Sequence, residues 1–280
     1  MHGVVVVDKE AGLTSHDVVD RLRRRLHERR IGHAGTLDPP ATGVLVCGVG
    51  RATRLLPFVA GTTKAYIGEI VLGVATTTLD DTGEVVACVA MDDVGVTQVR
   101  AAAASMTGEI EQLPPMVSAV RVAGRRLHEL AREGHQVERE ARSVTVHRFD
   151  VEPTSDPMVW QAAVECSAGT YVRSLAADLG AALGGAAHLR GLRRTAVGSF
   201  TAAEARPVDE APLQPVETAV RDLSRVDVEE ATAERVGHGA QLDPALMIGP
   251  PPWAVFGPDG ALLAVYEPHR DSTKPTVVLG

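Results

Sequence analysis

One acidic residue, Asp38, stands in a loop whose composition would hold it rigidly. The loop spans residues 32–43 and reads Gly-His-Ala-Gly-Thr-Leu-Asp-Pro-Pro-Ala-Thr-Gly. Its glycines permit tight turns, and Pro39 and Pro40 keep the residues before them out of helical geometry. A carboxylate on a stiff loop beside an apolar strand, here residues 44–47, is suited to act as nucleophile or general base. An Asp-Pro pair in a Gly-rich loop is more often a structural turn, so the loop alone leaves both interpretations open.

The complete string resembles the catalytic loop of the TruB family of tRNA pseudouridine synthases, in which the Asp is catalytic. Pro40 is unusual, since the family often has Leu there. The resemblance implies isomerisation of uridine 55 in the T-loop of tRNA to pseudouridine, in which an N–C glycosidic bond is broken and re-formed as C–C. It also implies that Asp38 is catalytic, as nucleophile or as base at the sugar, and that His33 supports the splayed RNA.

A second match is Lys64-Ala65-Tyr66, at the start of a predicted strand. A Tyr in a strand is usually a packing residue. The resemblance implies instead that Tyr66 stacks on the target base and that Lys64 contacts the substrate. This role is physically reasonable, because a flipped base needs an aromatic or apolar wall in place of its lost neighbours.

A third match is Gly169-Thr170-Tyr171-Val172-Arg173, which resembles the family's Gly-Thr-Tyr-Ile/Val-Arg. The resemblance implies that Arg173 pairs with Asp38 and that Tyr171 lines the pocket. A cation in the first turn of a helix is unfavourable to the helix dipole, so its position suggests a specific anionic partner. The alternative is a surface Arg bonded to Asp17 or Asp178.

Weaker matches extend the resemblance over residues 3–200. They are a His-Xaa3-Leu-Arg-Arg pattern at residues 188–194, a Gln-Xaa-Pro-Pro stretch at 112–121, and an Asp-Lys-Xaa-Xaa-Gly-Xaa-Thr-Ser pattern at 8–15. The resemblance implies that Leu192 packs at the active site and that an RNA-gripping insertion occupies about residues 121–148. The further substrate-binding residues that it implies are Lys9, Arg121 and Arg193.

The charge distribution is compatible with RNA although the net charge is −8. Arginines gather in residues 21–30, 121–148 and 190–194, and the excess of acidic residues lies beyond residue 200. Local basic stripes rather than total charge create a phosphate-binding surface. For residues 21–30 the alternative, a solvated helix face, is equally good.

Strand and helix patterns alternate without regular βαβ order. This predicts an α+β domain with a mixed, largely antiparallel central sheet flanked by helices. Predicted strands are residues 3–8, 44–49, 63–74, 84–89 (paired antiparallel with 63–74), 144–151, 158–167 and part of 188–200. Predicted helices are residues 14–30, 51–58, 96–106, about 127–133, and 170–183.

Pro207, Pro212 and Pro215 mark a change of composition. We expect a catalytic domain at residues 1–215 and a small domain at 216–280. Short strand patterns in the second unit suggest a small β-barrel, which loosely resembles the PUA domain of bacterial TruB proteins.

No ligand-spaced Cys/His set or P-loop is present, and the reaction implied by the resemblance needs neither metal nor organic cofactor. The three widely spaced cysteines, the lack of a transmembrane-length apolar run and the lack of a signal peptide fit a cytoplasmic protein. We expect tRNA as partner, no obligatory protein partner, and a monomer. Three alternatives are a non-catalytic RNA-binding module, a guide-RNA-dependent synthase, and a nucleotide-binding enzyme using the partial glycine motif at residues 48–53.

Overall fold

The structure is a computed structural model that describes residues 1–117, 121–122, 125–126 and 139–279. Its helices are α1 (Ser15–Leu26), α2 (Leu56–Ala60), α3 (Val96–Ser105), α5 (Val172–Ala182) and α6 (Glu230–Gly237), with 3-10 turns η1 (Gly50–Arg54), η2 (Val216–Val220) and η3 (Pro244–Leu246). None of the described helices is long and apolar enough to cross a membrane. The helix predicted near residue 127 lies outside the described residues.

A mixed sheet of nine strands forms the centre of the described structure, with the path β1-β3-β12-β4-β11-β10-β7. β2 pairs with β3, and β13 pairs with β12. Only β12 and β3 run parallel along this path, so the predicted α+β class with a largely antiparallel sheet is confirmed. The strands are β1 (Gly3–Lys9), β2 (Ile31–His33), β3 (Thr42–Val49), β4 (Lys64–Leu72), β7 (Gly108–Gln112), β10 (Arg142–Pro153), β11 (Val159–Cys166), β12 (Ala187–Val197) and β13 (Phe200–Thr201).

The predicted antiparallel pairing of residues 63–74 with residues 84–89 is confirmed only at its end, where Val74 pairs with Cys88. Most of the predicted long strand forms β4, which pairs with β11 and β12. The segment expected beside it forms β6 (Val85–Cys88), whose partner among the described residues is the short β5 (Val74–Thr76). β4 is buried along one face and needs partners on both edges, which the remote strands β11 and β12 supply. A second short pair joins β8 (Arg121–Val122) to β9 (Arg125–Arg126).

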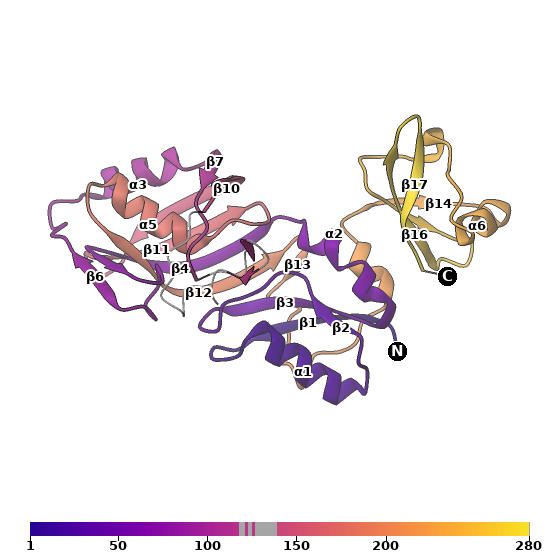
Figure 1. Ribbon diagram of the computed structural model, residues 1–280, viewed down its shortest axis with the longest axis horizontal. Coiled ribbons are helices and arrows are strands. Elements are labelled where there is room, and N and C mark those ends of the chain that lie inside the picture. The colour runs from indigo at the N-terminus through magenta and orange to yellow at the C-terminus, as the bar shows by residue number, and fades with distance from the viewer. Residues whose placement is uncertain (118–120, 123–124, 127–138, 280) are drawn as a thin grey trace.

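Helices cover the two halves of the sheet separately (Figure 1). α1 packs Val18 and Leu22 against Leu45 of β3, in one apolar cluster. α3 and α5 pack on the β4–β11–β10 half, where Leu175 and Ile70 share a second cluster. Each such fully buried aliphatic side chain contributes roughly 1.5–3 kcal/mol to folding. The two helical layers hold the sheet rigid on both sides of its centre.

α1 begins with the capping that its sequence predicts. Thr14 accepts a hydrogen bond from the Asp17 amide at 3.0 Å, and the Asp17 carboxylate accepts one from the Thr14 amide at 2.8 Å. Such a capping box satisfies two amides that the helix leaves free. The helix ends at Leu26 rather than at residue 30, because His27 adopts a left-handed conformation and the chain then joins the sheet as β2.

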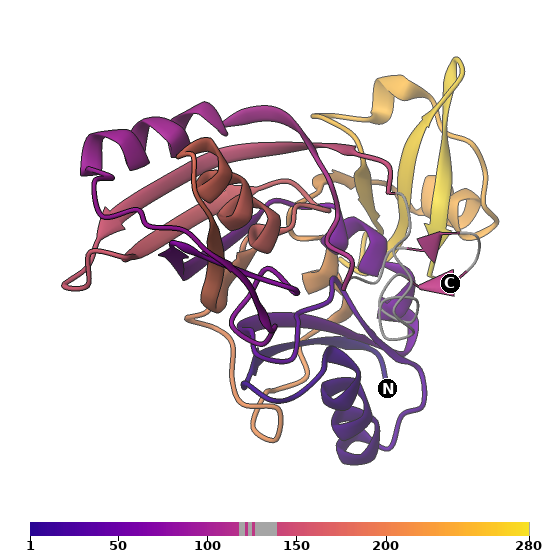
Figure 2. The ribbon, with the colours of Figure 1, turned by 60° about the vertical axis from the view of Figure 1, so that its left-hand side comes forward.

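The C-terminal unit carries a four-stranded sheet in the order β14-β15-β16-β17 (Figures 1 and 2). The predicted short strands are present, but within the described residues β14 and β17 do not pair, so the expected barrel is seen as an open sheet. Phe256 shares an apolar cluster with Val44, which joins the unit to the central sheet. The strands are β14 (Ser224–Asp227), β15 (Trp253–Phe256), β16 (Leu262–His269) and β17 (Ser272–Val278).

Candidate active site

The loop that carries Asp38 connects β2 to β3 and is fixed by side chains from three other segments. The Ser15 hydroxyl, in the first turn of α1, accepts from the Leu37 amide at 2.8 Å. The Lys9 ammonium group donates to the Pro39 carbonyl at 3.2 Å. The Leu37 amide gains its partner from Ser15, and the Pro39 carbonyl accepts a second hydrogen bond from the Gly12 amide at 2.8 Å. The rigid loop predicted from its glycines and prolines is therefore also held from outside.

Arg194 lies beneath this loop and is 1% exposed. Its guanidinium group donates to the carbonyls of Val44 at 2.8 Å, Gly35 at 3.1 Å and Thr36 at 3.3 Å. The prediction that Arg194 belongs to a phosphate-binding group is therefore wrong. A buried guanidinium needs its donors satisfied, and here carbonyls of the catalytic loop and of β3 satisfy them.

The predicted ion pair between Arg173 and Asp38 is confirmed. The Nη2 atom of Arg173 lies 2.9 Å from Oδ2 of Asp38. The side chain of Arg173 is 5% exposed and that of Asp38 is 42% exposed, so the pair is buried only on the arginine side. The alternative of a surface arginine bonded to Asp17 or Asp178 is excluded. An adjacent guanidinium favours the ionised carboxylate and fixes its orientation.

A second carboxylate, Asp80, also faces Arg173, and it is not among the site residues predicted from the sequence. The Nε atom of Arg173 lies 3.6 Å from Oδ2 of Asp80, which is 7% exposed. Asp80 is held in turn by the hydroxyl of Thr78 at 2.6 Å and the amide of Thr82 at 3.1 Å. Its Asp-Asp-Thr-Gly context indicated only a turn, and no local signal tied that turn to a helix more than ninety residues away.

Two backbone carbonyls complete the surroundings of Arg173. Its Nη1 atom donates to Thr78 at 2.8 Å, and its Nη2 atom donates to Val117 at 2.9 Å. The guanidinium group is thus shared between two carboxylates and two carbonyls. Four interactions leave it little freedom to reorient, so the position of Asp38 is set by the fold.

Asp38 opens into a cavity of about 280 Å³ between its own loop, the central strands β4 and β12, and the start of α5. This volume lies near the lower end of the range for small-molecule pockets. Its walls combine aromatic, apolar and charged side chains in a space that could hold one planar base. The lining residues used below are Asp38, Lys64, Tyr66, Tyr171, Arg173 and Leu192.

Tyr66 is the most deeply placed aromatic side chain of this cavity, and it is 9% exposed. It lies on β4 directly beside Arg194 of β12. Burial raises the pKa of the Tyr66 phenol, while the cation of Arg194 acts in the opposite direction. The phenol is therefore neutral at physiological pH, and its ring forms an apolar wall with a polar end.

Both predicted substrate-binding lysines use their ammonium groups on the protein itself. Lys64 donates to the carbonyls of Ala60 at 2.7 Å and Thr62 at 2.6 Å, although it also lines the cavity. Lys9 is 1% exposed and donates to Leu13 as well as to the loop. Burial lowers the pKa of each lysine to about 8.

The remaining predicted site residues are less central. His33 lies in β2 outside the cavity lining, and its buried Nδ1 atom has no hydrogen-bond partner among the described residues. Burial lowers the pKa of His33, which favours the neutral imidazole. Arg193 makes two bonds with Asp8, at 2.9 and 2.8 Å. The backbone of Arg121 lies in β8, and its side chain is outside the described part of the structure.

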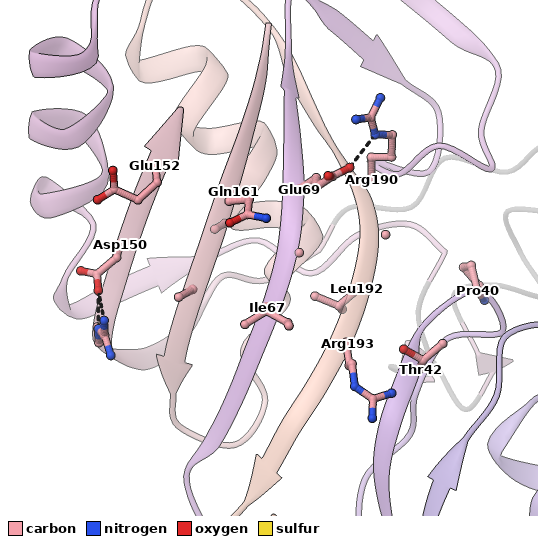
Figure 3. Close-up of a pocket in the computed structure, with 15 residues that line it drawn as sticks. Pro40, Thr42, Ile67, Glu69, Asp150, Glu152, Gln161, Arg190, Leu192 and Arg193 are labelled. Carbon is pink, nitrogen blue, oxygen red and sulfur yellow. Dashed lines mark hydrogen bonds and ion pairs between the residues drawn. The ribbon is translucent and has the colours of Figure 1, made fainter. Parts of the chain in front are cut away.

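A second and larger cavity, of about 540 Å³, lies on the other face of β4 and reaches Arg193 (Figure 3). Ile67 and Glu69 point into it, whereas Tyr66 and Ile70, at alternating positions, face the core. Glu69 pairs with Arg190 at 2.9 Å across the strands. Leu192 lines both cavities, because it follows an irregularity in β12 at Gly191.

Within the described residues, no group of three His, Cys, Asp or Glu side chains is placed to hold a metal ion. Cys47 and Cys166 are buried in strands, and Cys88 is exposed. Burial raises the pKa of the Cys47 thiol to about 12 and that of Cys166 to about 11. Neither buried thiol is therefore a reactive nucleophile at physiological pH.

Three family models cover most of the chain. Residues 23–172 match the TruB family pseudouridylate synthase N-terminal domain. Residues 173–221 match the tRNA pseudouridylate synthase B C-terminal domain, and residues 223–280 match the C-terminal model of tRNA pseudouridine synthase II.

Whole-chain comparisons agree with these models. The tRNA pseudouridine synthase B of Thermobifida fusca (strain YX) is 47% identical over 290 aligned positions, covering 99% of this chain and 98% of the relative. That of Mycobacterium sp. (strain KMS) is 46% identical, covering 99% and 96%.

The fold also resembles that of a solved structure. A chain of a crystallised Cbf5-Nop10-Gar1 complex superposes with a TM-score of 0.76 at 25% identity, covering 99% of this chain and 85% of that one. The loop with Asp38, its arginine partner and the surrounding sheet thus occur in a chain that is similar to named synthases over nearly its whole length. The chain therefore belongs to the TruB family of pseudouridine synthases.

Proposed function

We propose that this protein converts uridine 55 in the T-loop of tRNA to pseudouridine. The observation that carries the proposal is the Asp38 carboxylate, which lines a base-sized cavity and is held 2.9 Å from a buried guanidinium group. The relatives named tRNA pseudouridine synthase B support tRNA as the substrate. Within tRNA, uridine 55 is the target position implied by the resemblance of the Asp38 loop to the catalytic loop of the TruB family.

The reaction is an isomerisation without net oxidation. The bond from N1 of the base to the sugar breaks, a bond from C5 to the same sugar carbon forms, and the proton leaves C5 while N1 gains one. Asp38 acts either as nucleophile or as base at the sugar. In both routes it must be ionised, and the cation of Arg173 favours that state.

The target uridine must leave the stacked loop, which costs a few kcal/mol. We propose that Tyr66 offsets part of this cost by stacking on the flipped base, with Tyr171 and Leu192 shaping the remaining walls. Arg173 orients Asp38. The support for these roles is that all five side chains line one cavity.

We propose that Lys9 and Lys64 act chiefly by fixing the loop and the start of β4, since their ammonium groups are bonded to carbonyls. His33 would support the splayed RNA beside the loop. Arg121 and Arg193 would contact phosphates, which for Arg193 requires an exchange between Asp8 and the RNA.

The domain boundaries proposed are residues 1–215 for catalysis, with an RNA-gripping insertion at about 121–148, and 216–280 for a PUA-like unit. The family models, which change near residues 173 and 223, support a separate C-terminal unit. A cytoplasmic monomer that needs no protein partner is the simplest state for such an enzyme, and tRNA is its expected partner.

The test compares an unmodified tRNA transcript with a copy that carries cytidine at position 55, both incubated with purified protein in EDTA. We expect pseudouridine at position 55 of the first transcript only, mapped by mass spectrometry. Product elsewhere would contradict the site. Binding of the transcript without product would favour the alternative function, a non-catalytic RNA-binding module.

The matched variant is Asp38→Asn, with Asp92→Asn as an exposed control. We expect Asp38→Asn to reduce turnover by at least about a thousandfold, as for loss of an essential nucleophile or base, and to leave tRNA affinity nearly unchanged. Turnover near that of wild type would refute the assignment of Asp38.

A further inference from the structure

The outer side of α1 presents arginines that the proposed reaction does not use. Val18, Val19 and Leu22 are buried on its inner side. Arg21 and Arg24, three residues apart, therefore lie together on the outer side. We call these two, with Arg29 and Arg30 in the segment after the helix, the α1 arginine face.

These arginines differ from their neighbours in lacking partners. Arg23 pairs with Asp20 at 2.9 Å, and Arg25 donates to the Val208 carbonyl at 2.6 Å. By contrast, no residue of the α1 arginine face makes a side-chain hydrogen bond or ion pair with another described residue. Exposed arginines in other parts of the described chain are commonly paired, as Arg190, Arg221 and Arg225 are.

The nearby acidic residues, Asp17, Asp20, Glu28 and Asp209, are fewer than the six arginines of residues 21–30, so this region keeps a net positive charge. The Asp17 carboxylate accepts bonds from Thr14, and Asp20 is paired with Arg23. Glu28 accepts from the Arg30 amide and lies 3.8 Å from the N-terminal amine. A surface concavity of about 470 Å³ remains, lined by three guanidinium groups and one carboxylate; its residues are Arg21, Arg24, Arg25 and Asp209.

The α1 arginine face is rigidly connected to the catalytic loop but lies outside the cavity. Ser15, at the start of α1, is bonded to Leu37 at 2.8 Å. Arg21 and Arg24 follow it by six and nine residues, or about 9 and 14 Å along the helix axis. No residue of α1 lines the cavity around Asp38. A single ligand that contacts both the cavity around Asp38 and the α1 arginine face must therefore be extended. The arginines require the part that contacts them to be anionic.

We propose that the α1 arginine face binds the phosphate backbone of the substrate tRNA outside the T-arm stem-loop. This rests on the proposed function. A protein of net charge −8 repels a polyanion as a whole, so its affinity for RNA depends on local groups of arginines. An arginine without a carboxylate partner can bind a phosphate without first breaking an ion pair within the protein. The cavity around Asp38 could hold one base and is lined by no residue of α1, so the α1 arginine face is available to RNA other than the flipped uridine.

The test is the double variant Arg21→Gln and Arg24→Gln, with the double variant Arg100→Gln and Arg225→Gln as a control of equal charge change. The control arginines are exposed, are paired with Glu152 and Asp227, and lie outside the arginine groups named above. Dissociation constants are measured for full-length tRNA and for the isolated T-arm stem-loop across a series of salt concentrations.

We expect the α1 variant to bind full-length tRNA about tenfold more weakly, with the salt dependence reduced by roughly two phosphate contacts. Its affinity for the stem-loop and its kcat should match those of the control. An unchanged affinity for full-length tRNA, or an equal loss for the stem-loop, would overturn the inference. Turnover of wild-type protein on the stem-loop tests the proposed function independently, because these binding constants do not depend on catalysis.

Discussion

Replacing Arg173 with alanine tests how the fold holds the catalytic carboxylate. The substitution removes the group that lies between Asp38 and Asp80 and that donates to the carbonyls of Thr78 and Val117. Asp80 then remains as a buried carboxylate without its counter-charge. Asp38 loses its orientation, but its partly exposed side chain stays hydrated.

The expected loss of stability follows from the burial of each partner. Removing one member of a buried ion pair costs roughly 3–5 kcal/mol. Water screens the contribution of Asp38, which is 42% exposed, so that share is small. Asp80 keeps its hydrogen bonds to Thr78 and Thr82, which softens the penalty. We therefore expect a loss of about 3 kcal/mol, at the lower end of that range.

A loss of about 3 kcal/mol corresponds to a fall in Tm of roughly 6–12 °C for a chain of this size. Thermal and urea unfolding of Arg173→Ala would measure it, with Arg190→Ala as control. That residue is 44% exposed and paired with Glu69, so its loss should cost no more than about 1 kcal/mol.

Adding Asp80→Asn to Arg173→Ala removes the uncompensated charge and should restore about 1 kcal/mol of the lost stability. Turnover should remain low in the double variant, since Asp38 is still not oriented. A Tm within about 2 °C of wild type for Arg173→Ala alone would refute this account of the buried guanidinium.

Two further predictions concern the support of the loop. Gly43→Ala should lower the unfolding free energy by more than about 2 kcal/mol, because Gly43 has φ of 102° and an added Cβ would lie 2.1 Å from the Arg194 carbonyl oxygen. Gly12→Ala, with φ of 85° and open space around it, should cost only about 1 kcal/mol; equal losses in urea unfolding would contradict the packing argument. Burial lowers the pKa of Lys9 from 10.5 to about 8, so the unfolded chain binds more protons between these values and the unfolding free energy should rise with pH from 8 to 10.5. The rise should be smaller in Lys9→Met, though still present because Lys64 shifts in the same direction, and identical slopes would show that Lys9 is not the source.

Local sequence was sufficient for features that depend on neighbouring residues. Thr14 and Asp17 encode the start of α1, and the glycines and prolines of residues 32–43 encode a stiff loop before a buried strand. The same locality explains the error at the end of α1. A run of arginines continues a helical pattern, but the helix ends at Leu26 because His27 adopts a left-handed conformation, and the chain joins the sheet at Ile31.

The resemblance of short motifs went further, since it indicated the contact between Arg173 and Asp38. The motifs could not show how deeply Arg173 and Asp38 are buried, because burial depends on which remote segments pack around the two side chains. It also gave no sign of Asp80, which reaches Arg173 only through the path of the chain between β5 and β6.

The sequence by itself determined which residues could do chemistry, because the types and spacing of the Asp38 loop and of the Gly-Thr-Tyr-Val-Arg motif are properties of short segments. Only the tertiary structure decided what each arginine does. Arg173 faces carboxylates, Arg194 holds loop carbonyls and Arg24 is left exposed, although all three have the same side chain. The physical reason is that a guanidinium group acts through the partners and the burial it meets, and remote segments supply both.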